Sequence, residues 1–572
     1  MSVDPRLTAF FDAAVGEYLL STSDRVLGEL TARRSGVRTH AAVPIAVALL
    51  ARARDDGHSA LSLSDLAAEA TELARELAAD AGLEDSCAQI CERDAAWWRT
   101  MLEAVPSVVQ VANSLVASPL VLHGSLLQFR RYFDAEQRIA ARIHASLSQN
   151  EPTFRVITGG PGTGKTTRIA HLLVETLERD PELRVALAAP TGKAAARLSE
   201  SIRLRLDDAK ASPEVRARVP QSARTVHRLL GYQPDRDRFW SRAGTPLPYD
   251  LVILDEASMV DVLLMDALVA ALPVHATLLL VGDQDQLASV EAGDVLGAIC
   301  RVAHDLGAGN ALHDSVQRLT RSYRFEAHPA IGDAAAAMLA GDAAALGAIV
   351  HDTERPDVRW APAPHDRAEL LARLVPHLKA CLEAATPAAA LTALDGFRVL
   401  CAEREGTWGV AGINAQVEHW LRSQGTVITE RWYHRRPVMV MANDYGTQVF
   451  NGDVGVAWEA DGEMLVHFPA PEGATRAIQP ARLPETQTAW AMTVHKAQGS
   501  EFTNVIVILP AKGSRVLGRE LLYTAVTRAR SNVLIVGDES VMRSAVSRTV
   551  RRGSGLEALL RHAIRRESVP HG

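Results

Sequence analysis

Hydrophobic and polar positions follow two different patterns along the chain. From residue 1 to about residue 120, apolar residues recur every three or four positions, as in LSDLAAEATELARELAADAG between Leu63 and Gly82. That spacing is typical of amphipathic α-helices. No catalytic sequence motif occurs in this stretch. We therefore expect residues 1–120 to form a helical N-terminal domain.

Short apolar runs separated by helical stretches dominate the rest of the chain. Such runs, each ended by Gly, Pro, Asp or Glu, are typical of buried parallel strands, and their alternation with helices predicts doubly wound α/β sheets. One block covers residues 121–350, with strands predicted at Phe154–Thr158, Val185–Ala189, Leu251–Leu254 and Thr277–Val281. A second block covers residues 351–572, with strands predicted at Arg398–Cys401, Val438–Ala442, Val505–Leu509 and Asn532–Val536. The fold class is therefore α/β, with two such domains.

Two segments interrupt this pattern. Residues 232–250 combine turn residues with aromatics, which predicts a surface hairpin in the first α/β domain. Residues 437–485 contain closely spaced β-like runs, which predict a small antiparallel β insert in the second domain.

Composition indicates the class of protein and the cellular compartment to expect. Of its 572 residues 47% are apolar and 23% charged, as in soluble globular proteins, and the net charge is −7. An acidic chain is unsuited to coating nucleic acid, but it can still carry a local cationic groove that binds DNA. No apolar run approaches the ~18 residues of a membrane span. The N-terminus does not resemble a secretory signal, and the five cysteines fit a reducing compartment. These features predict a cytoplasmic protein without a membrane partner.

A phosphate-binding loop follows the first predicted strand. The segment GGPGTGKT, residues 159–166, fits GxxxxGK(S/T) and lies between a strand and a helix, as this motif requires. Its backbone N–H groups and the helix N-terminus would surround phosphate oxygens. Lys165 would bridge the β- and γ-phosphates, and the Thr166 hydroxyl would hold Mg²⁺. A glycine turn without a ligand is the alternative, and it requires a chance match of the motif.

Two further predicted strands end in polar residues suited to nucleotide hydrolysis. Asp255 ends one strand, where it would hold Mg²⁺, and Glu256 follows, where it would orient and deprotonate the attacking water. An exposed acidic strand end is the alternative. Gln286, after the next strand, could contact the γ-phosphate because its amide both donates and accepts. Arg324 and Arg528 are candidates for stabilising transition-state charge, provided that the second α/β domain faces the nucleotide.

Eight strings in order resemble the motif set of superfamily-1 helicases over about 400 residues. They are GGPGTGKTT, APTGKAAARL, TVHRLLG, DEAS, GDQDQLASV, SYRF, TVHKAQGSEF and YTAVTRAR. The string GDQDQLASV lacks the aromatic residue usual in the 3′→5′ branch, so the chain is similar to the 5′→3′ branch. Within that branch it resembles the RecD family, the alpha subunits of exodeoxyribonuclease V (RecBCD). The linker PLVLHGSLLQFRRYFDAEQ and the insert RPVMVMANDYGTQVFNGDVGV support this resemblance.

The resemblance implies a fold and a set of site residues. It implies two RecA-like motor domains, an SH3-like insert in the second, and ATP and Mg²⁺ as cofactors. Gln137 matches the residue that contacts adenine, and Arg324 and Arg528 match two arginine fingers. The other positions implied for the nucleotide are Gly160, Pro161, Gly162, Thr163, Gly164, Lys165, Thr166, Thr167, Asp255, Glu256, Gln286, Gly499 and Glu501. The positions implied for a single-strand DNA channel are Pro190, Thr191, Thr225, His227, Thr493 and His495.

The function implied is that of an ATP-dependent 5′→3′ single-strand DNA translocase and helicase. It would be a motor subunit that, in a heterotrimer with RecB-like and RecC-like subunits, processes double-strand DNA ends for recombinational repair. By analogy with the family, the helical N-terminal domain would dock on those partners. We find no local cluster of carboxylates and lysine suited to DNA cleavage, so the nuclease site is expected on another subunit. An ATP-gated DNA clamp that unwinds little alone is the alternative; an RNA-directed helicase of the same branch is a third.

Overall fold

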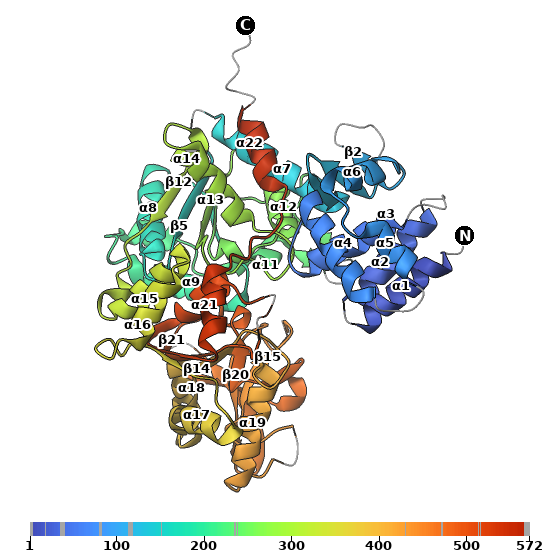
Figure 1. Ribbon diagram of the computed structural model, residues 1–572. Helices are drawn as coiled ribbons and strands as arrows, with labels where there is room; N and C mark the ends of the chain where they lie inside the picture. The colour runs from blue at the N-terminus through green and yellow to red at the C-terminus, as the bar shows by residue number, and fades with distance from the viewer. Residues whose placement is uncertain are drawn as a thin grey trace.

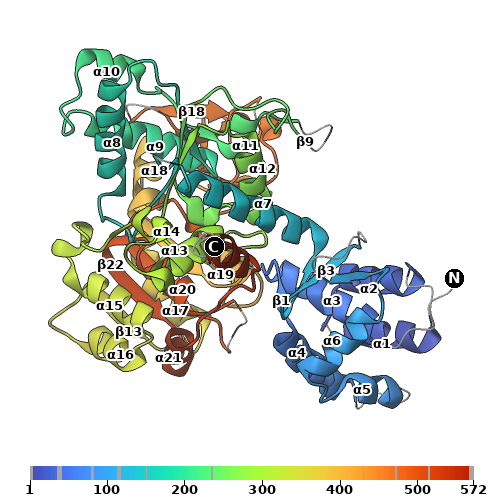
Figure 2. The ribbon, with the colours of Figure 1, turned by 90° about the horizontal axis from the view of Figure 1, so that it is seen from above.

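A computed structural model describes residues 4–565 apart from residues 18, 35–40, 79–82, 112–117, 150, 234–235, 237, 429–430, 445, 471–472, 513 and 515. Figure 1 shows two α/β units stacked one above the other, with the N-terminal unit beside the upper one. Seen from above, in Figure 2, the N-terminal unit projects to one side and joins the rest near β1, β3 and α7. Among the described residues, no helix has both the length and the apolar character needed to cross a membrane.

The N-terminal unit is mainly helical, as predicted, and Trp98 lies at 0% exposure in its core. Its helices are α1 (Pro5–Gly16), α2 (Thr22–Arg34), α3 (Ala42–Asp55), α4 (Leu63–Leu77), α5 (Glu84–Ile90) and α6 (Ala95–Glu103). A four-stranded sheet that we did not predict joins the unit to the rest, in the order β1-β4-β3-β2. Its strands are β1 (Leu61–Ser62), β2 (Val109–Val111), β3 (Leu120–His123) and β4 (Leu126–Phe129).

The first α/β unit is built on a six-stranded sheet in the order β12-β5-β11-β10-β6-β7, and every pair in it is parallel. Its strands are β5 (Phe154–Gly159), β6 (Val185–Ala189), β7 (Arg224–Thr225), β10 (Leu251–Leu254), β11 (Thr277–Gly282) and β12 (Val316–Leu319). The flanking helices are α7 (Arg130–Leu147), α8 (Lys165–Arg179), α9 (Gly192–Arg205), α10 (Pro213–Arg218), α11 (Val226–Leu230), α12 (Val262–Ala271), α13 (Val295–Leu306) and α14 (Ala311–Asp314). The four predicted strands are confirmed. The predicted hairpin is also present, as β8 (Tyr232–Gln233) paired with β9 (Arg238–Phe239).

The second α/β unit has a five-stranded parallel sheet in the order β13-β22-β21-β14-β20. Its strands are β13 (Val358–Ala361), β14 (Phe397–Cys401), β20 (Ala491–Thr493), β21 (Phe502–Ile508) and β22 (Ala529–Val536). Its helices include α17 (Arg367–Leu382), α18 (Pro387–Gly396), α19 (Val410–Ser423), α20 (Arg519–Val526) and α21 (Glu539–Ser547). The two parallel sheets confirm the expected fold class.

The predicted β insert lies between α19 and β20 as an antiparallel sheet in the order β18-β17-β16-β15-β19. Its strands are β15 (Pro437–Val440), β16 (Val454–Ala460), β17 (Glu463–Pro469), β18 (Thr475–Ile478) and β19 (Thr486–Thr488). The run predicted at Val438–Ala442 therefore belongs to the insert and not to the parallel sheet. The SH3-like character of the insert stays a prediction.

Segments from both sides of residue 350 contribute to each core. Helices α15 (Pro329–Ala340) and α16 (Ala343–His351) pack in the core of the second unit. The last described helix, α22 (Leu556–Arg565), returns to pack against α7 and α13 of the first unit. The chain therefore crosses between the two α/β units twice. The domain ranges 1–120, 121–350 and 351–572 stay predictions.

Candidate nucleotide and DNA site

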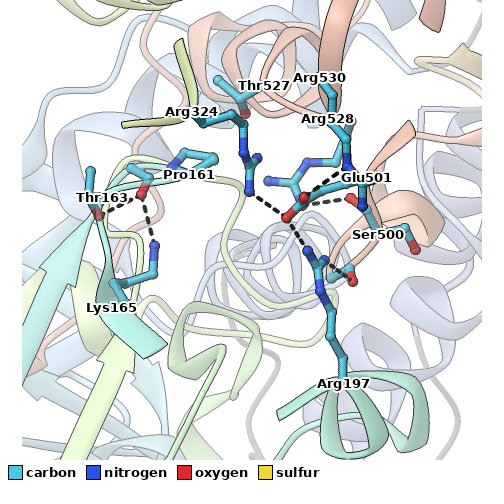
Figure 3. A network of polar contacts seen from close by, with 12 residues as sticks. Pro161, Thr163, Lys165, Arg197, Arg324, Ser500, Glu501, Thr527, Arg528 and Arg530 are labelled. Carbon is cyan, nitrogen blue, oxygen red and sulfur yellow. Dashed lines mark hydrogen bonds and ion pairs between the residues drawn. The ribbon is translucent and has the colours of Figure 1, made fainter. Parts of the chain in front are cut away.

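The phosphate-binding loop joins β5 to α8, which begins at Lys165. The Lys165 Nζ donates to the carbonyl oxygens of Gly159 and Gly160 at 2.6 and 3.0 Å. The Thr163 hydroxyl donates to the Gly160 oxygen at 2.8 Å. These bonds hold the ammonium group beside the loop, as Figure 3 shows. A phosphate chain bound by the loop would exchange these carbonyl contacts for a stronger ionic one.

Gly162 allows a second segment to pack directly on the loop. Its φ is 75°, and a Cβ there would lie 2.3 Å from the Cβ of Arg324. The Ser322 hydroxyl donates to the Pro161 oxygen at 2.8 Å, and the Tyr323 N–H donates to the Gly162 oxygen at 3.0 Å. The SYRF segment is thereby fixed to the loop, which places Arg324 beside it.

Gly162→Ala is expected to weaken nucleotide binding and destabilise the first α/β unit. The alanine must adopt a left-handed conformation, which costs about 1–2 kcal/mol, and its methyl group must displace Arg324. Chemical denaturation and binding of a fluorescent ADP analogue measure the two effects. Gly244→Ala is the matched control, because a Cβ at Gly244 has no heavy atom within 4 Å. Equal unfolding stability and equal nucleotide affinity of the two variants would contradict the packing of Arg324 against Gly162.

Two carboxylates follow β10, directly beside the loop. Asp255 is largely enclosed; burial, and after it the charge of Glu256, raises the pKa of its carboxyl group. Burial likewise raises the pKa of Asp283 at the end of β11. The charge of the nearby Lys165 ammonium opposes both shifts. Glu256 has a φ of 52°, in the left-handed region that residues other than glycine adopt uncommonly.

The loop after β11, residues 283–287, carries Gln286 and contacts the second α/β unit; we name it the sensor loop. The Gln286 Nε2 donates to Asp283 Oδ2 at 2.8 Å, and the same oxygen accepts from the Tyr523 hydroxyl of α20 at 3.0 Å. The Leu287 N–H donates to Thr524 Oγ1 at 3.0 Å. Gln286 is therefore linked to α20 through one carboxylate. Sequence reasoning missed Asp283 and Tyr523, although both lie inside the quoted motif strings.

Glu501 forms ion pairs with arginines from both α/β units, as Figure 3 shows. Its Oε1 accepts from Arg324 Nη2 at 2.6 Å and also pairs with Arg197 of α9, and its Oε2 lies 3.5 Å from Arg530 Nε. Burial alone would raise the pKa of Glu501, but the charges of Arg324 and Arg197 prevail and lower it to about 2. The carboxylate is therefore ionised at neutral pH. Arg197 was not among the predicted site residues, although it lies in the string APTGKAAARL.

The two predicted arginine fingers lie close to one another. Burial lowers the pKa of Arg324, and the charges of Arg528 and Arg197 act in the same direction. Arg528 is 3% exposed and donates to the carbonyl oxygens of Thr524 and Ser500 at 3.2 and 3.3 Å. The Arg324 Nη1 is buried and has no hydrogen-bond partner among the described residues. Neighbouring buried cations with a free donor are suited to an anionic ligand.

The other predicted nucleotide-binding residues make fewer contacts with the rest of the protein. Thr166 and Thr167 are half-buried in the first turn of α8, and Gly499 has a φ of 70°. Gln137 is exposed on α7, and its side chain makes no hydrogen bond within the described part of the chain. The described residues contain no group of three or more His, Cys, Asp or Glu side chains that could hold a metal. Thr166 and Asp255 fit Mg²⁺, which commonly takes one or two protein oxygens together with phosphates and water.

Each of the three predicted DNA-binding threonines lies at the start of a helical segment. The hydroxyls of Thr191, Thr225 and Thr493 accept from backbone N–H groups three residues onward, at 3.2, 3.2 and 3.3 Å. Thr191 and Pro190 follow β6, Thr225 ends β7 and Thr493 ends β20. In the first unit these positions lie at the same sheet edge as the phosphate-binding loop, because the carboxyl ends of parallel strands share one edge. Helix starts at that edge present backbone N–H groups of a kind that suits an anionic ligand.

Burial favours the neutral form of the two predicted histidines. Burial lowers the pKa of His227, whose ring lies 5.6 and 5.8 Å from the ring centroids of Tyr232 and Phe239. Burial, followed by the charges of Arg552 and Arg404, lowers the pKa of His495 to about 4. Both side chains would contact a nucleic acid through ring faces or neutral hydrogen bonds rather than through charge.

Three family models match the chain in order. The one described as RecBCD enzyme subunit RecD, N-terminal domain, matches residues 17–127. An AAA domain matches residues 143–292, and a UvrD-like helicase C-terminal domain matches residues 488–536.

Full-length relatives extend this match. The RecBCD enzyme subunit RecD of Mycobacterium tuberculosis strain H37Rv is 40% identical over 492 residues, which cover 78% of this chain and 83% of that protein. The same subunit of Mycolicibacterium smegmatis is 42% identical over 456 residues, covering 77% and 78%. The ATP-dependent RecD2 DNA helicase of Deinococcus radiodurans is 36% identical over 401 residues, covering 69% and 48%. With this identity over most of both chains, the protein belongs to the RecD family of RecBCD enzyme subunits.

Proposed function

We propose that this chain is an ATP-dependent 5′→3′ single-strand DNA translocase and helicase. It works in the cytoplasm as the motor subunit of a helicase–nuclease complex with RecB-like and RecC-like subunits, at duplex DNA ends. The observation that carries the proposal is the position of Arg324, Arg528 and Glu501 between the phosphate-binding loop and the second α/β unit. A nucleotide bound there contacts both RecA-like units, so its turnover changes their relative position.

Each site residue has a separate role in the binding or hydrolysis of ATP. Lys165 and the N–H groups of residues 160–167 bind the phosphates, and Gln137 contacts the adenine. Thr166 and Asp255 would hold Mg²⁺, which supplies positive charge to the phosphate oxygens. Glu256 orients the attacking water and takes its proton, and Gln286 contacts the γ-phosphate. Arg324 and Arg528 stabilise the charge that develops on the transferred phosphoryl group.

Glu501 sets the position of one arginine finger. In this structure it pairs with Arg324, whose remaining Nη1 has no hydrogen-bond partner within the described part of the chain. A bound phosphate would compete for this guanidinium, and the pairing with Arg197 would hold Glu501 in place meanwhile. Gly499 and Glu501 would also border the ribose and phosphates, which connects nucleotide binding to the second unit.

The DNA path follows the strand ends described above. A single strand would run along Pro190, Thr191, Thr225 and His227 of the first unit and Thr493 and His495 of the second. Backbone contacts of this type give little sequence preference. Because the path touches both units, opening and closing of the ATP site moves the strand by steps.

Unwinding of tailed duplexes tests the proposed direction. With ATP and Mg²⁺, the protein is expected to separate a duplex with a 5′ single-stranded tail and to leave a duplex with a 3′ tail paired. Strand separation is followed by loss of energy transfer between two dyes. Turnover of ATP without unwinding of either substrate would favour the ATP-gated clamp, and unwinding of the 3′-tailed duplex alone would overturn the assigned branch.

A further inference from the structure

A short segment between α21 and α22 connects all three structural units. We name residues 548–555 the C-terminal strap. Helix α21 packs in the second core and α22 in the first, so the strap spans the two α/β units. In Figure 1 this segment runs from α21 up to α22 and passes close to the N-terminal unit. Any movement of one α/β unit against the other must be accommodated in the strap.

Arg552 attaches the strap to residues 287–293, which we name the sensor segment. Its Nη1 donates to the carbonyl oxygens of Glu291 and Gly293 at 2.8 and 3.1 Å, and lies 3.4 Å from the Ser289 hydroxyl. Hydrogen bonds from a cation to carbonyl groups are stronger than those from a neutral donor. Residues 289–293 lie between Leu287, which contacts α20, and the start of α13. Arg552 therefore fixes one end of the sensor segment while α20 fixes the other.

The N-terminal unit forms hydrogen bonds with both the strap and the segment that Arg552 contacts. The N–H groups of Ser59 and Ala60 donate to the Gly553 oxygen at 2.9 and 3.1 Å, and the Gly553 N–H donates to His58 Nδ1 at 2.8 Å. The Gly293 N–H donates to the Gly57 oxygen at 2.9 Å. Residues 57–60 thus contact both the strap and the sensor segment.

A buried carboxylate on α7 completes the junction. Glu136 is 0% exposed and accepts from Ser59 Oγ, Ser554 Oγ and Gly555 N at 2.6, 2.7 and 3.0 Å. These donors come from the N-terminal unit and the strap, and Glu136 itself comes from the first α/β unit. Four partners, Gln128 Nε2 included, satisfy the carboxylate, so the three segments are held in one arrangement.

We propose that Arg552 is a positioning residue for nucleotide turnover, which acts through residues 289–293 on the sensor loop and couples that loop to the N-terminal unit. The proposal rests on the proposed ATPase function of the same chain. It assigns to the N-terminal unit a mechanical connection to the sensor loop, in addition to the partner docking expected of that unit. Movement of the two α/β units during turnover would pull on the strap and thus on residues 57–60.

The test compares Arg552→Ala with Arg551→Ala in the full chain. Arg551 is the neighbouring, exposed residue, and it forms no ion pair among the described residues, which makes it a matched control. For Arg552→Ala we expect kcat of DNA-stimulated ATP hydrolysis to fall about tenfold, with the KM for ATP within about twofold of the parent value. Amide hydrogen exchange should become faster in residues 57–60 and 287–293 and stay unchanged in β5. Arg551→Ala should change neither readout.

Arg552→Lys separates positioning from folding. It keeps the charge but not the planar guanidinium that reaches several acceptors, so its kcat should fall between those of the parent and Arg552→Ala. If Arg552→Ala fails to fold, the lysine variant alone decides the question, and parent-like kcat together with faster exchange in residues 287–293 would overturn the proposal. Parent-like kcat in both folded variants would overturn it as well. Absence of DNA-stimulated hydrolysis in the parent chain would instead overturn the proposed function.

Discussion

Lys165→Ala is expected to abolish ATP hydrolysis, with a loss of at least about 10³-fold in kcat. The ammonium donates to carbonyls of the phosphate-binding loop, its charge opposes the rise in the pKa of Asp255 and Asp283, and no other lysine lies in that loop. Its loss removes the cation that would bridge the β- and γ-phosphates. Release of inorganic phosphate in the presence of single-stranded DNA measures the effect.

Lys512→Ala is the control for this prediction, because Lys512 is exposed. We expect it to hydrolyse ATP at the parent rate. The Lys165 side chain bonds only to two loop carbonyls among the described residues, so its removal should leave thermal unfolding close to that of the parent. Hydrolysis by a folded Lys165→Ala variant within about tenfold of the parent would place the active site elsewhere.

The parallel strands that sequence patterns predicted are the interior strands of the two parallel sheets. Leu251–Leu254 and Val185–Ala189 coincide with β10 and β6, which lie inside the first sheet. Interior strands of a parallel sheet are apolar on both faces, so they form recognisable runs. The edge strands β7 and β12 were missed. The first has two residues, and Gln317 and Arg318 of the second are exposed, so neither forms an apolar run.

The same distinction applies to the candidate site. The phosphate-binding loop is contiguous in sequence, so its geometry follows from residues 159–166 and the strand and helix around them. Contacts between distant segments could not be predicted in the same way. Arg197 and Glu501 are 304 positions apart, and Tyr523 and Asp283 are 240 positions apart. Their pairing depends on how the two α/β units pack, which no local pattern contains.

The N-terminal unit shows a further limit of sequence patterns. Helical periodicity predicted its helices, whereas its four-stranded sheet has strands of two to four residues. Strands of this length are too short to show a clear alternation of apolar and polar positions. The bonds from residues 57–60 to the C-terminal strap join segments almost 500 positions apart, and no sequence pattern indicates them. These long-range contacts are where the structure adds most to the mechanism.

Arg528→Ala is expected to lower kcat by about 10³-fold while nucleotide binding changes little. Arg528 is buried beside Arg324 and donates only to the carbonyl oxygens of Thr524 and Ser500, so its charge is not neutralised by an ion pair among the described residues. A guanidinium held in this way is available to stabilise charge on the transferred phosphoryl group. Single-turnover hydrolysis and binding of a fluorescent ADP analogue separate the two quantities.

Arg530→Ala provides the matched control, since Arg530 lies two residues onward and is 56% exposed, and its Nε is 3.5 Å from the same Glu501. If Arg528 acted only by supporting the fold around Glu501, both variants should lose activity to a similar degree and Arg528→Ala should bind nucleotide poorly. A transition-state role predicts instead that Arg528→Ala binds nucleotide and hydrolyses it slowly, while Arg530→Ala resembles the parent. Combining Arg528→Ala with Arg324→Ala should then cost less than the product of the two single losses, because both guanidinium groups act on one transition state.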